Sequence, residues 1–269
     1  MAMLQRLRED IREMFTEQVA YRELLIQMTR RDLMLRYKQT VMGFGWAVFM
    51  PLVNTIIFSV VFIRVAPLDT GMPYPLYAYC GLVTWNFFAS SLRFAVNSLT
   101  GNTNLVTKVY FPREIFPFTT IVVSLVDFAV ASIVLVLFMA YYRVGVTSAV
   151  LFLPVILIVH IAFTAGVALL LAMANLFYRD VKYLFEVVLT FWMFATSVLY
   201  PVSLAGGRLA DLLQLNPMTP IIEAYRTVLL RGELPAPGPF AMAGVLAFLT
   251  LSFAWVVFHR AEFQFAENV

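Results

Sequence analysis

Apolar residues in this chain gather in long stretches that are separated by short polar segments. A helix needs about 20 mostly apolar residues to cross the hydrocarbon core of a bilayer. Six stretches approach or exceed this length, and they cover residues 44–65, 74–97, 115–142, 147–177, 183–201 and 240–258. The pattern therefore predicts an all-α integral membrane protein, with a transmembrane domain of six helices over residues 44–269.

The segment before the first stretch, residues 1–43, has a different pattern. Apolar side chains recur there at helical spacing with charged residues between them: Leu4, Leu7, Ile11, Met14, Phe15 and Val19. Such a pattern predicts an amphipathic helix lying along the inner membrane surface. A soluble helix packed on a partner would show the same pattern and is the alternative.

The segment between the fifth and sixth stretches, about residues 202–232, contains "NPMTPIIEAYRTVLLRG". Its apolar part is too short to span a bilayer. We expect short re-entrant or interfacial helices at the outer face. Pro217 and Pro220 suit a helix start, and Gly232 suits a helix end.

Basic residues orient the predicted spans. They concentrate on the side that holds both termini: Arg6, Arg8, Arg12, Arg22, Arg30, Arg31, Arg36, Lys38, Lys108, Arg113, Arg179, Lys182 and Arg260. Loops rich in Lys and Arg stay in the cytoplasm. Both termini are therefore predicted to be cytoplasmic, as is the segment "NLVTKVYFPREI" at residues 104–115.

Composition agrees with a membrane protein, because 61% of the residues are hydrophobic and 13% are charged. Soluble domains average about 25% charged residues. The net charge of +3 gives little support for nucleic acid binding. One cysteine, Cys80, excludes an internal disulfide and a cysteine-based zinc site. The first forty residues contain no apolar core of a secretory signal, and no lipidation motif is found.

Catalytic patterns are absent from the sequence. HExxH, GxSxG and the phosphate-binding GxxxxGK[ST] do not occur, and the two histidines, His160 and His259, have no neighbouring ligand in sequence. We therefore expect no enzyme activity, no metal and no cofactor in this chain. An integral membrane enzyme would need clustered acids or a metal site.

Two charges fall within predicted spans, Arg93 in the second and Asp127 in the third. Charges in the hydrocarbon are costly and face a partner or a wet cavity. We expect these two to pair with each other, either as a packing contact or in a transport path. Aromatic residues concentrate in the first and fifth spans, and Trp46, Phe49, Phe58, Phe191, Trp192 and Tyr200 are candidates to line a channel, with lipid-facing positions as the alternative.

Several stretches together resemble one known family. They are "RDLMLRYKQTVMGFGWAVFMPL", "GLVTWNFFASSLRFAVNSLTGNTNLVTKVYFPREIFP", "ANLFYRDVKYL", "LYPVSL" followed by "LNPMTPIIEAYR", and the tail "EFQFAEN". The chain resembles the membrane subunit of type-2 ABC exporters for cell-surface polysaccharides, which are O-antigen, capsule and teichoic acid. The resemblance covers nearly the whole chain, in order.

The resemblance implies a homodimer in the bacterial inner membrane with two copies of a cytoplasmic ABC ATPase, which would bind ATP and magnesium. It implies a coupling helix at about residues 101–114 that docks on the ATPase. The ATPase contacts it assigns are Lys108, Tyr110, Arg113, Glu114, Arg179 and Asp180. It places an external gate at Asn216, Pro217, Glu223, Tyr225 and Arg226, and the walls of the channel in spans one and five.

The leading functional hypothesis is export of a lipid-linked polysaccharide, with O-antigen as the foremost substrate. Arg36 and Lys38, just before the first span, are candidates to receive the anionic head of the lipid carrier, because arginine can bind phosphate oxygens in two places at once. Simple anchoring of the span by these charges is the alternative. An exporter of a small lipid or drug, or a secondary transporter, would be the competing functions. A secondary transporter would normally show repeated halves, and none are found.

Overall fold

The computed structural model describes residues 16–38, 40–108, 111–202, 206, 213 and 215–265. Within these residues every regular element is a helix, as the sequence predicts. The elements are α2 (Arg22–Tyr37), α3 (Gly45–Val60), η1 (Val61–Val65), α4 (Tyr74–Ala95), η2 (Thr100–Asn102), α5 (Thr103–Lys108), α6 (Ile115–Tyr141), η3 (Ser148–Phe152), α7 (Leu153–Phe177), α8 (Val181–Phe194), α10 (Met218–Arg226), η5 (Thr227–Arg231), α11 (Pro237–Ala261) and η6 (Glu262–Gln264).

Four helical segments are long and apolar enough to cross a membrane, and they are Gly45–Val65, Ile115–Tyr141, Ser148–Phe177 and Pro237–Gln264. They correspond to the first, third, fourth and sixth predicted spans. α4 has 22 residues, about 33 Å at 1.5 Å per residue, but it is more polar. α8 has 14 residues, about 21 Å, which is shorter than a hydrocarbon core of about 30 Å. The count of six spans stays a prediction.

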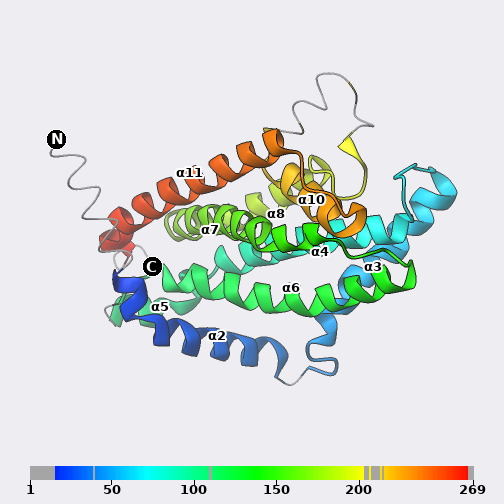
Figure 1. The fold of residues 1–269 in the computed structure, drawn as a ribbon. Coiled ribbons are helices and arrows are strands. Elements are labelled where there is room, and N and C mark those ends of the chain that lie inside the picture. The colour runs from blue at the N-terminus through cyan, green and yellow to red at the C-terminus, as the bar shows by residue number, and fades with distance from the viewer. Residues whose placement is uncertain are drawn as a thin grey trace.

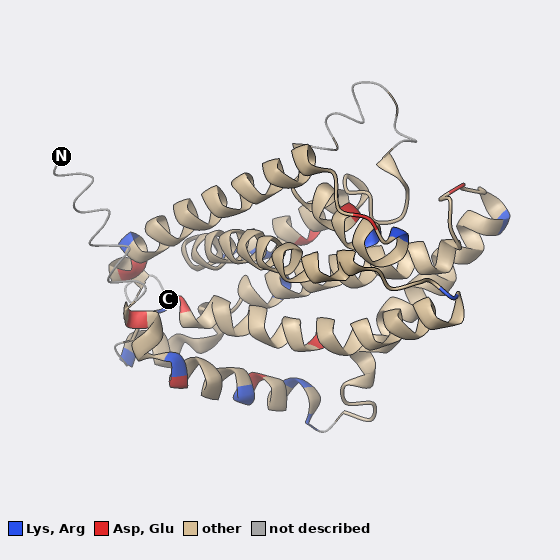
Figure 2. Ribbon diagram, viewed as in Figure 1, with Lys and Arg blue, Asp and Glu red and all other residues tan. Residues whose placement is uncertain are grey.

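The long helices run side by side between two ends of the bundle (Figure 1). One end, here called the α5 end, holds α5, the start of α2 and the end of α11. The opposite end, here called the α10 end, holds α10 and the loop between α3 and α4. Charged residues lie mostly at these two ends and along α2, whereas the middle stretches of α7 and α11 carry none (Figure 2). This distribution fits helices whose middle parts lie in lipid.

The core of the bundle forms around α4, which is buried along most of its length. α7 and α11 pack closely because α7 carries a glycine at the contact. A Cβ atom placed on Gly166 would lie 2.8 Å from the backbone nitrogen of Leu251. The two backbones therefore approach more closely than any side chain at position 166 would allow, as small residues permit in membrane helices.

α2 runs alongside α6 from the α5 end (Figure 1). Met28 is its buried apolar residue and joins a cluster that includes Phe111 and Phe116. The predicted amphipathic pattern falls mainly on residues 1–15, which lie outside the described residues. The position of α2 brings its last turn beside the middle of α6, and this contact shapes the candidate site.

The helix expected before Gly232 is present. Pro217 lies at the N-terminal cap of α10, and the helix continues through η5 to Gly232, whose φ of 72° closes it. A positive φ at this position favours glycine. Residues 203–205, 207–212 and 214, which complete the predicted external segment, lie outside the described residues. The role of α10 as a gate is taken up below as a proposal.

Candidate functional site

A polar face runs along α4. Between residues 76 and 95 its accessible side chains are Asn86, Ser90, Arg93 and Phe94, and every other residue in that stretch is buried. Asn86, Ser90, Arg93 and Asn97 follow one another at spacings of four, three and four residues, which places them on one side of a helix. A helix that is otherwise buried therefore opens one polar stripe to its surroundings.

A cavity of about 540 Å³ lies along this stripe, between α2, α3, α4 and α6. Its polar side chains, together with Trp46 and Phe94, come from all four helices: Arg36, Tyr37, Trp46, Asn54, Asn86, Ser90, Arg93, Phe94, Ser124 and Asp127. A second cavity of about 520 Å³ shares Arg36 and Phe94 with it and continues toward the α5 end.

A third cavity, of about 420 Å³, adjoins the second at Asn97 and Gly101. Its lining includes Arg179 and Lys182, and no acidic side chain. The three adjoining cavities, called the polar groove from here on, lead from the α5 end to the middle of the bundle. Amides, hydroxyls, guanidinium groups and one indole along such a path are the groups that hydrate or contact a polar solute.

Asp127 is held by the end of α2. Its carboxylate accepts hydrogen bonds from the Arg36 guanidinium and the Tyr37 hydroxyl. The Arg36 guanidinium also lies over the ring of Phe94, 3.7 Å from the ring centre, which is a favourable cation–π distance. Burial and the hydrogen bond to Asp127 raise the pKa of Tyr37 to about 12. The Tyr37 hydroxyl therefore remains a hydrogen-bond donor at neutral pH.

The predicted pair of Arg93 with Asp127 is wrong. Arg93 forms an ion pair at 3.2 Å with Glu186 on α8, and both side chains are about half exposed. Asp127 pairs with Arg36 instead. The reason is the position of α2. This helix runs alongside α6 and brings Arg36 closer to Asp127 than α4 brings Arg93. The sequence alone gave no sign that Arg36 and Arg93 compete for Asp127.

Of the six predicted channel aromatics, Trp46 is the one that lines the groove. Phe49 is 43% exposed and makes an edge-to-face contact with Trp46 at 5.6 Å. Phe58 is half-buried and stacks on Phe62. Phe191 is 72% exposed on the surface of α8.

The other two of these aromatics make defined polar contacts. The Trp192 indole makes edge contacts with both Phe88 and Phe163 and donates to Asn216 Oδ1 at 3.0 Å. Tyr200 donates its hydroxyl to the carbonyl of Phe194. Neither ring lines the polar groove, and both hold the segment that follows α8.

Sequence reasoning missed the polar residues of the groove, namely Asn54, Asn86, Ser90 and Ser124. The repeat of polar residues at positions 86, 90, 93 and 97 was available as a signal. A polar stripe of helical period inside an apolar stretch indicates a face that is not in contact with lipid.

Arg226 forms a buried clamp at the α10 end. Its side chain is fully buried, and its guanidinium donates to the Tyr77 hydroxyl at 2.8 Å and to the carbonyls of Ser197 and Val198 at 2.6 and 2.5 Å. It also pairs with Glu223 at 2.9 Å. This one residue therefore joins α10 to α4 and to the segment that follows α8. The predicted gate residue Tyr225 is buried in the core cluster.

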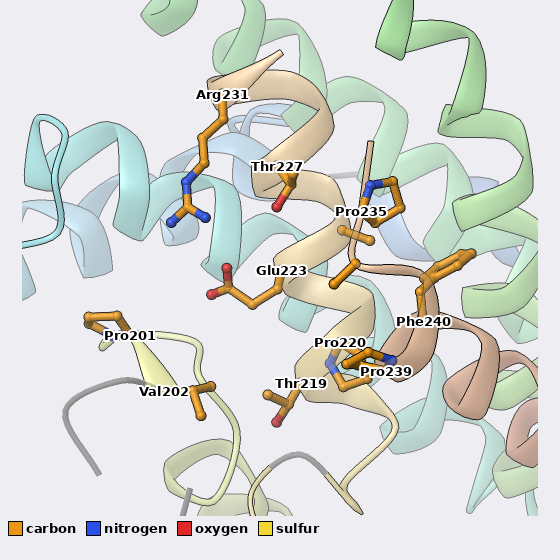
Figure 3. Close-up of a pocket in the computed structure, with 12 residues that line it drawn as sticks. Pro201, Val202, Thr219, Pro220, Glu223, Thr227, Arg231, Pro235, Pro239 and Phe240 are labelled. Carbon is orange, nitrogen blue, oxygen red and sulfur yellow. The ribbon is translucent and has the colours of Figure 1, made fainter. Parts of the chain in front are cut away.

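A cavity of about 410 Å³ adjoins this clamp (Figure 3). Glu223, Thr227 and Arg231 project toward it from α10 and η5, and Pro201 and Phe240 close it from the neighbouring segments. The predicted gate residue Asn216 lies just before α10 in the chain. It binds Trp192, Thr196 and the carbonyl of Ala195. Of the predicted gate residues, Asn216 and Arg226 bind the segment that follows α8.

The predicted coupling helix corresponds to η2 and α5. Val106 is its buried residue, and Lys108 is exposed. Tyr110 lies outside the described residues. Arg179 and Asp180 are exposed in the short connection between α7 and α8, at the same end of the bundle.

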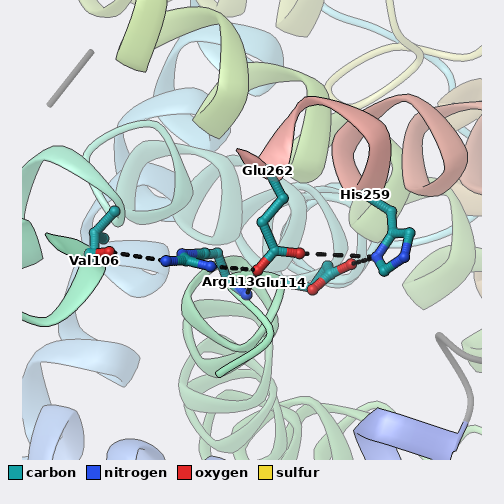
Figure 4. A network of polar contacts seen from close by, with 5 residues as sticks. All are labelled: Val106, Arg113, Glu114, His259 and Glu262. Atoms are coloured by element: carbon teal, nitrogen blue, oxygen red, sulfur yellow. Dashed lines mark hydrogen bonds and ion pairs between the residues drawn. The ribbon is translucent and has the colours of Figure 1, made fainter. Parts of the chain in front are cut away.

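Arg113 and Glu114, which were predicted to contact an ATPase, bind other parts of this chain (Figure 4). Arg113 pairs with Glu262 at 3.0 Å, and Glu114, with 1% of its surface exposed, binds His259 at 3.2 Å. Ligand-capable atoms of Glu114, His259 and Glu262 lie within 4.8 Å of one another. This cluster is the place in the described residues where a metal ion could be bound, although Arg113 already occupies one carboxylate oxygen of Glu262.

Comparison with known proteins gives the family. The family model for "ABC-2 type transporter" matches residues 23–230. The chain belongs to this family. The match includes α2 from its second residue, the predicted coupling helix, the groove and the Arg226 clamp.

Individual relatives align over nearly the whole chain. The chain is 30% identical to an "O-antigen export system permease protein RfbA" of Myxococcus xanthus, over 93% of this chain and 96% of that protein. It is 26% identical to a protein of the same name from Klebsiella pneumoniae, over 91% of this chain and 94% of that protein. A second Klebsiella pneumoniae protein of that name is 25% identical over 246 residues.

Proposed function

We propose that this chain is the transmembrane subunit of an ATP-driven exporter that moves a lipid-linked polysaccharide, foremost an O-antigen, across the bacterial inner membrane. The family match and the names of the relatives support an exporter of this kind. The observation that carries the proposal is the polar groove, because an otherwise apolar bundle has a use for such a path only if a polar solute enters it.

The chemistry of the groove suits a sugar chain. Sugar hydroxyls are donors and acceptors, which the amides of Asn54 and Asn86 and the hydroxyl of Ser90 can satisfy. The apolar face of a sugar ring can lie against an aromatic ring, and Trp46 supplies one at the groove. Weak contacts of this kind do not hold a polymer at one register, so they permit it to slide.

The lipid carrier would approach from the α5 end. Arg36 and Lys38 remain the proposed contacts for its anionic head. Arg36 lines two cavities of the groove but is already paired with Asp127, and Lys38 is exposed at the end of α2. We therefore assign to Arg36 a contact inside the groove, and to Lys38, which lies farther along α2 from the α5 end, an electrostatic contact at the exposed surface beside it.

The proposed assembly is a homodimer of six-span subunits with both termini in the cytoplasm and two ATPase copies at the α5 end. α4 would be the second span, and α8 with the residues after it would be the fifth. Both α3 and α8 expose apolar side chains, among them Ile57 and Val188, and a second subunit or lipid would cover them. Lys108, Arg179 and Asp180 are the exposed candidates for ATPase contact, and α10 with the clamp would form the external gate.

Deletion of the gene in its host, followed by complementation, tests this function. Cells that lack the chain should lose surface polysaccharide and accumulate lipid-linked polymer in the inner membrane. Trp46→Ala should restore only part of the surface polymer, whereas Phe253→Ala, a control at an exposed aromatic of α11, should restore it fully. Normal surface polymer in the deletion strain would show that the substrate is different.

A further inference from the structure

The predicted coupling helix and the residues after it, about 101–114, are here called the coupling segment. Its end is bound to the last turn of α11 and to η6. The carboxylate oxygen Oε1 of Glu262 accepts two hydrogen bonds from Arg113, one from its backbone N–H and one from Nη1, each at 3.0 Å. The other terminal nitrogen, Nη2, donates to the carbonyl of Val106 in α5 at 3.0 Å. One guanidinium therefore joins α5, the start of α6 and η6 (Figure 4).

A second contact lies beside the first. His259 Nδ1 lies 3.2 Å from Glu114 Oε1 and 3.8 Å from Glu262 Oε2. The other oxygen of Glu114 is buried and has no hydrogen-bond partner among the described residues. With a protonated His259, the two cations and two carboxylates balance in charge. Separating the contact would leave Glu114 buried without its partner, which is costly for an ionised group.

α11 is connected through packing contacts to the opposite end of the molecule. It packs against α7 at the close contact of Gly166 and Leu251. At the far end of α7, the hydroxyl of Thr147 donates to the carbonyl of Gly232 at 2.8 Å, directly after η5. α10 also packs against both α7 and α11. A displacement of α11 along its axis would therefore reach α10 and the Arg226 clamp.

We propose that Glu262 is a positioning residue that transmits movement of the coupling segment into α11, and through α7 to the α10 end. The proposal rests on the proposed function, because an ATPase must move α5. It assigns Arg113 and Glu114 to contacts within this chain and leaves exposed Lys108 to contact the partner. The physical basis is a chain of hydrogen bonds and close backbone packing that joins the coupling segment to the α10 end.

The test uses the full chain with its ATPase partner in nanodiscs. Cys80 is replaced by alanine, and Glu233→Cys provides an exposed reporter just after Gly232. The measurement is the rate at which a maleimide labels this cysteine, with and without ATP and vanadate. The contacts of Arg113 and Glu114 with His259 and Glu262 are here called the latch. The transporter with an intact latch should show a labelling rate that changes with nucleotide.

Glu262→Gln should reduce that nucleotide-dependent change by about fivefold or more, a typical size of coupling between sites, while co-purification with the ATPase stays normal. Arg113→Gln should do the same, and the double variant should add little, because both remove one interaction. Arg113→Lys, which keeps the charge but cannot bridge Val106 and Glu262 together, should also lose coupling and serves if Glu262→Gln does not fold. Glu23→Gln, at an exposed carboxylate of α2, is the control.

A full nucleotide response in Glu262→Gln would overturn the proposal, and so would loss of ATPase binding, which would make Glu262 a docking residue. The labelling readout needs no polysaccharide. An intact response in a transporter that exports no polysaccharide would therefore overturn the proposed function and support the latch.

Discussion

Gly81 of α4 lies against the guanidinium of Arg226. A Cβ atom placed on Gly81 would collide with Arg226 Nη2 and with the carbonyl oxygen of Val198. The missing side chain lets an arginine lie fully buried beside α4, where it binds the carbonyls at the end of α8. The close approach of a backbone to a charged group explains a glycine in the interior of a helix.

Gly81→Ala should therefore destabilise the protein, although alanine favours helices in general. The added methyl group must displace Arg226 from its carbonyl partners, and a drop of several degrees in melting temperature in detergent is expected. Gly244→Ala in α11 is the matched control, because the nearest atom to its added Cβ would be 3.8 Å away. Equal melting temperatures for the two variants would contradict this reading of the clamp.

Arg226→Lys should lose most of the clamp. Lysine keeps the charge, but its single nitrogen cannot reproduce the fork that binds Tyr77, Ser197 and Val198 together. We expect lower yield and lost export, compared with a mild effect of Tyr77→Phe, which removes one of these partners. Yield and surface polymer are measured together, and a fully active Arg226→Lys would refute the structural role.

Asp127→Asn should be more harmful alone than together with Arg36→Gln. The single change leaves the Arg36 guanidinium without its carboxylate in a site where each side chain is 17% exposed. Breaking a buried pair costs about 3–5 kcal/mol, and the partial exposure here reduces this. Melting temperatures of both single variants and the double variant form the test, and strictly additive effects would show that the pair contributes little.

Asn86→Leu should reduce export without reducing the amount of protein. The change removes an amide from the polar groove and leaves α4 apolar at a position that already lies in a helix. Gln27→Leu, at an exposed position of α2 outside the groove, controls for loss of an amide as such. Surface polymer per unit of protein is measured, and undiminished export would exclude Asn86 from the path.

Lys108→Glu and Arg113→Glu should fail in different ways. Lys108 is exposed, so its reversal should weaken co-purification with the ATPase. Arg113 pairs with Glu262, so its reversal should leave the ATPase bound and uncouple it. Quantifying the ATPase that purifies with each variant separates the two, and identical loss of the partner in both would return Arg113 to the docking surface.

The apolar helices could be read from the sequence because each has a run of about 20 side chains that lipid or a helical neighbour must cover. Four such runs are confirmed as long apolar helices. The helix expected between Pro217 and Gly232 is also present as α10 and η5, and its place in a gate stays a prediction. These features depend on local composition and on the backbone preferences of proline and glycine. Each of these features is therefore determined by the residues of a single segment.

The partners of charged side chains could not be read in this way. Asp127 binds Arg36, which is 91 positions away, and Arg113 binds Glu262, which is 149 positions away. Each charge had several possible partners of opposite sign, and the choice depends on which helices pack together. The position of α2 beside α6 settled the first, and the end of α11 settled the second, because a buried charge pairs with the nearest group that packing brings to it.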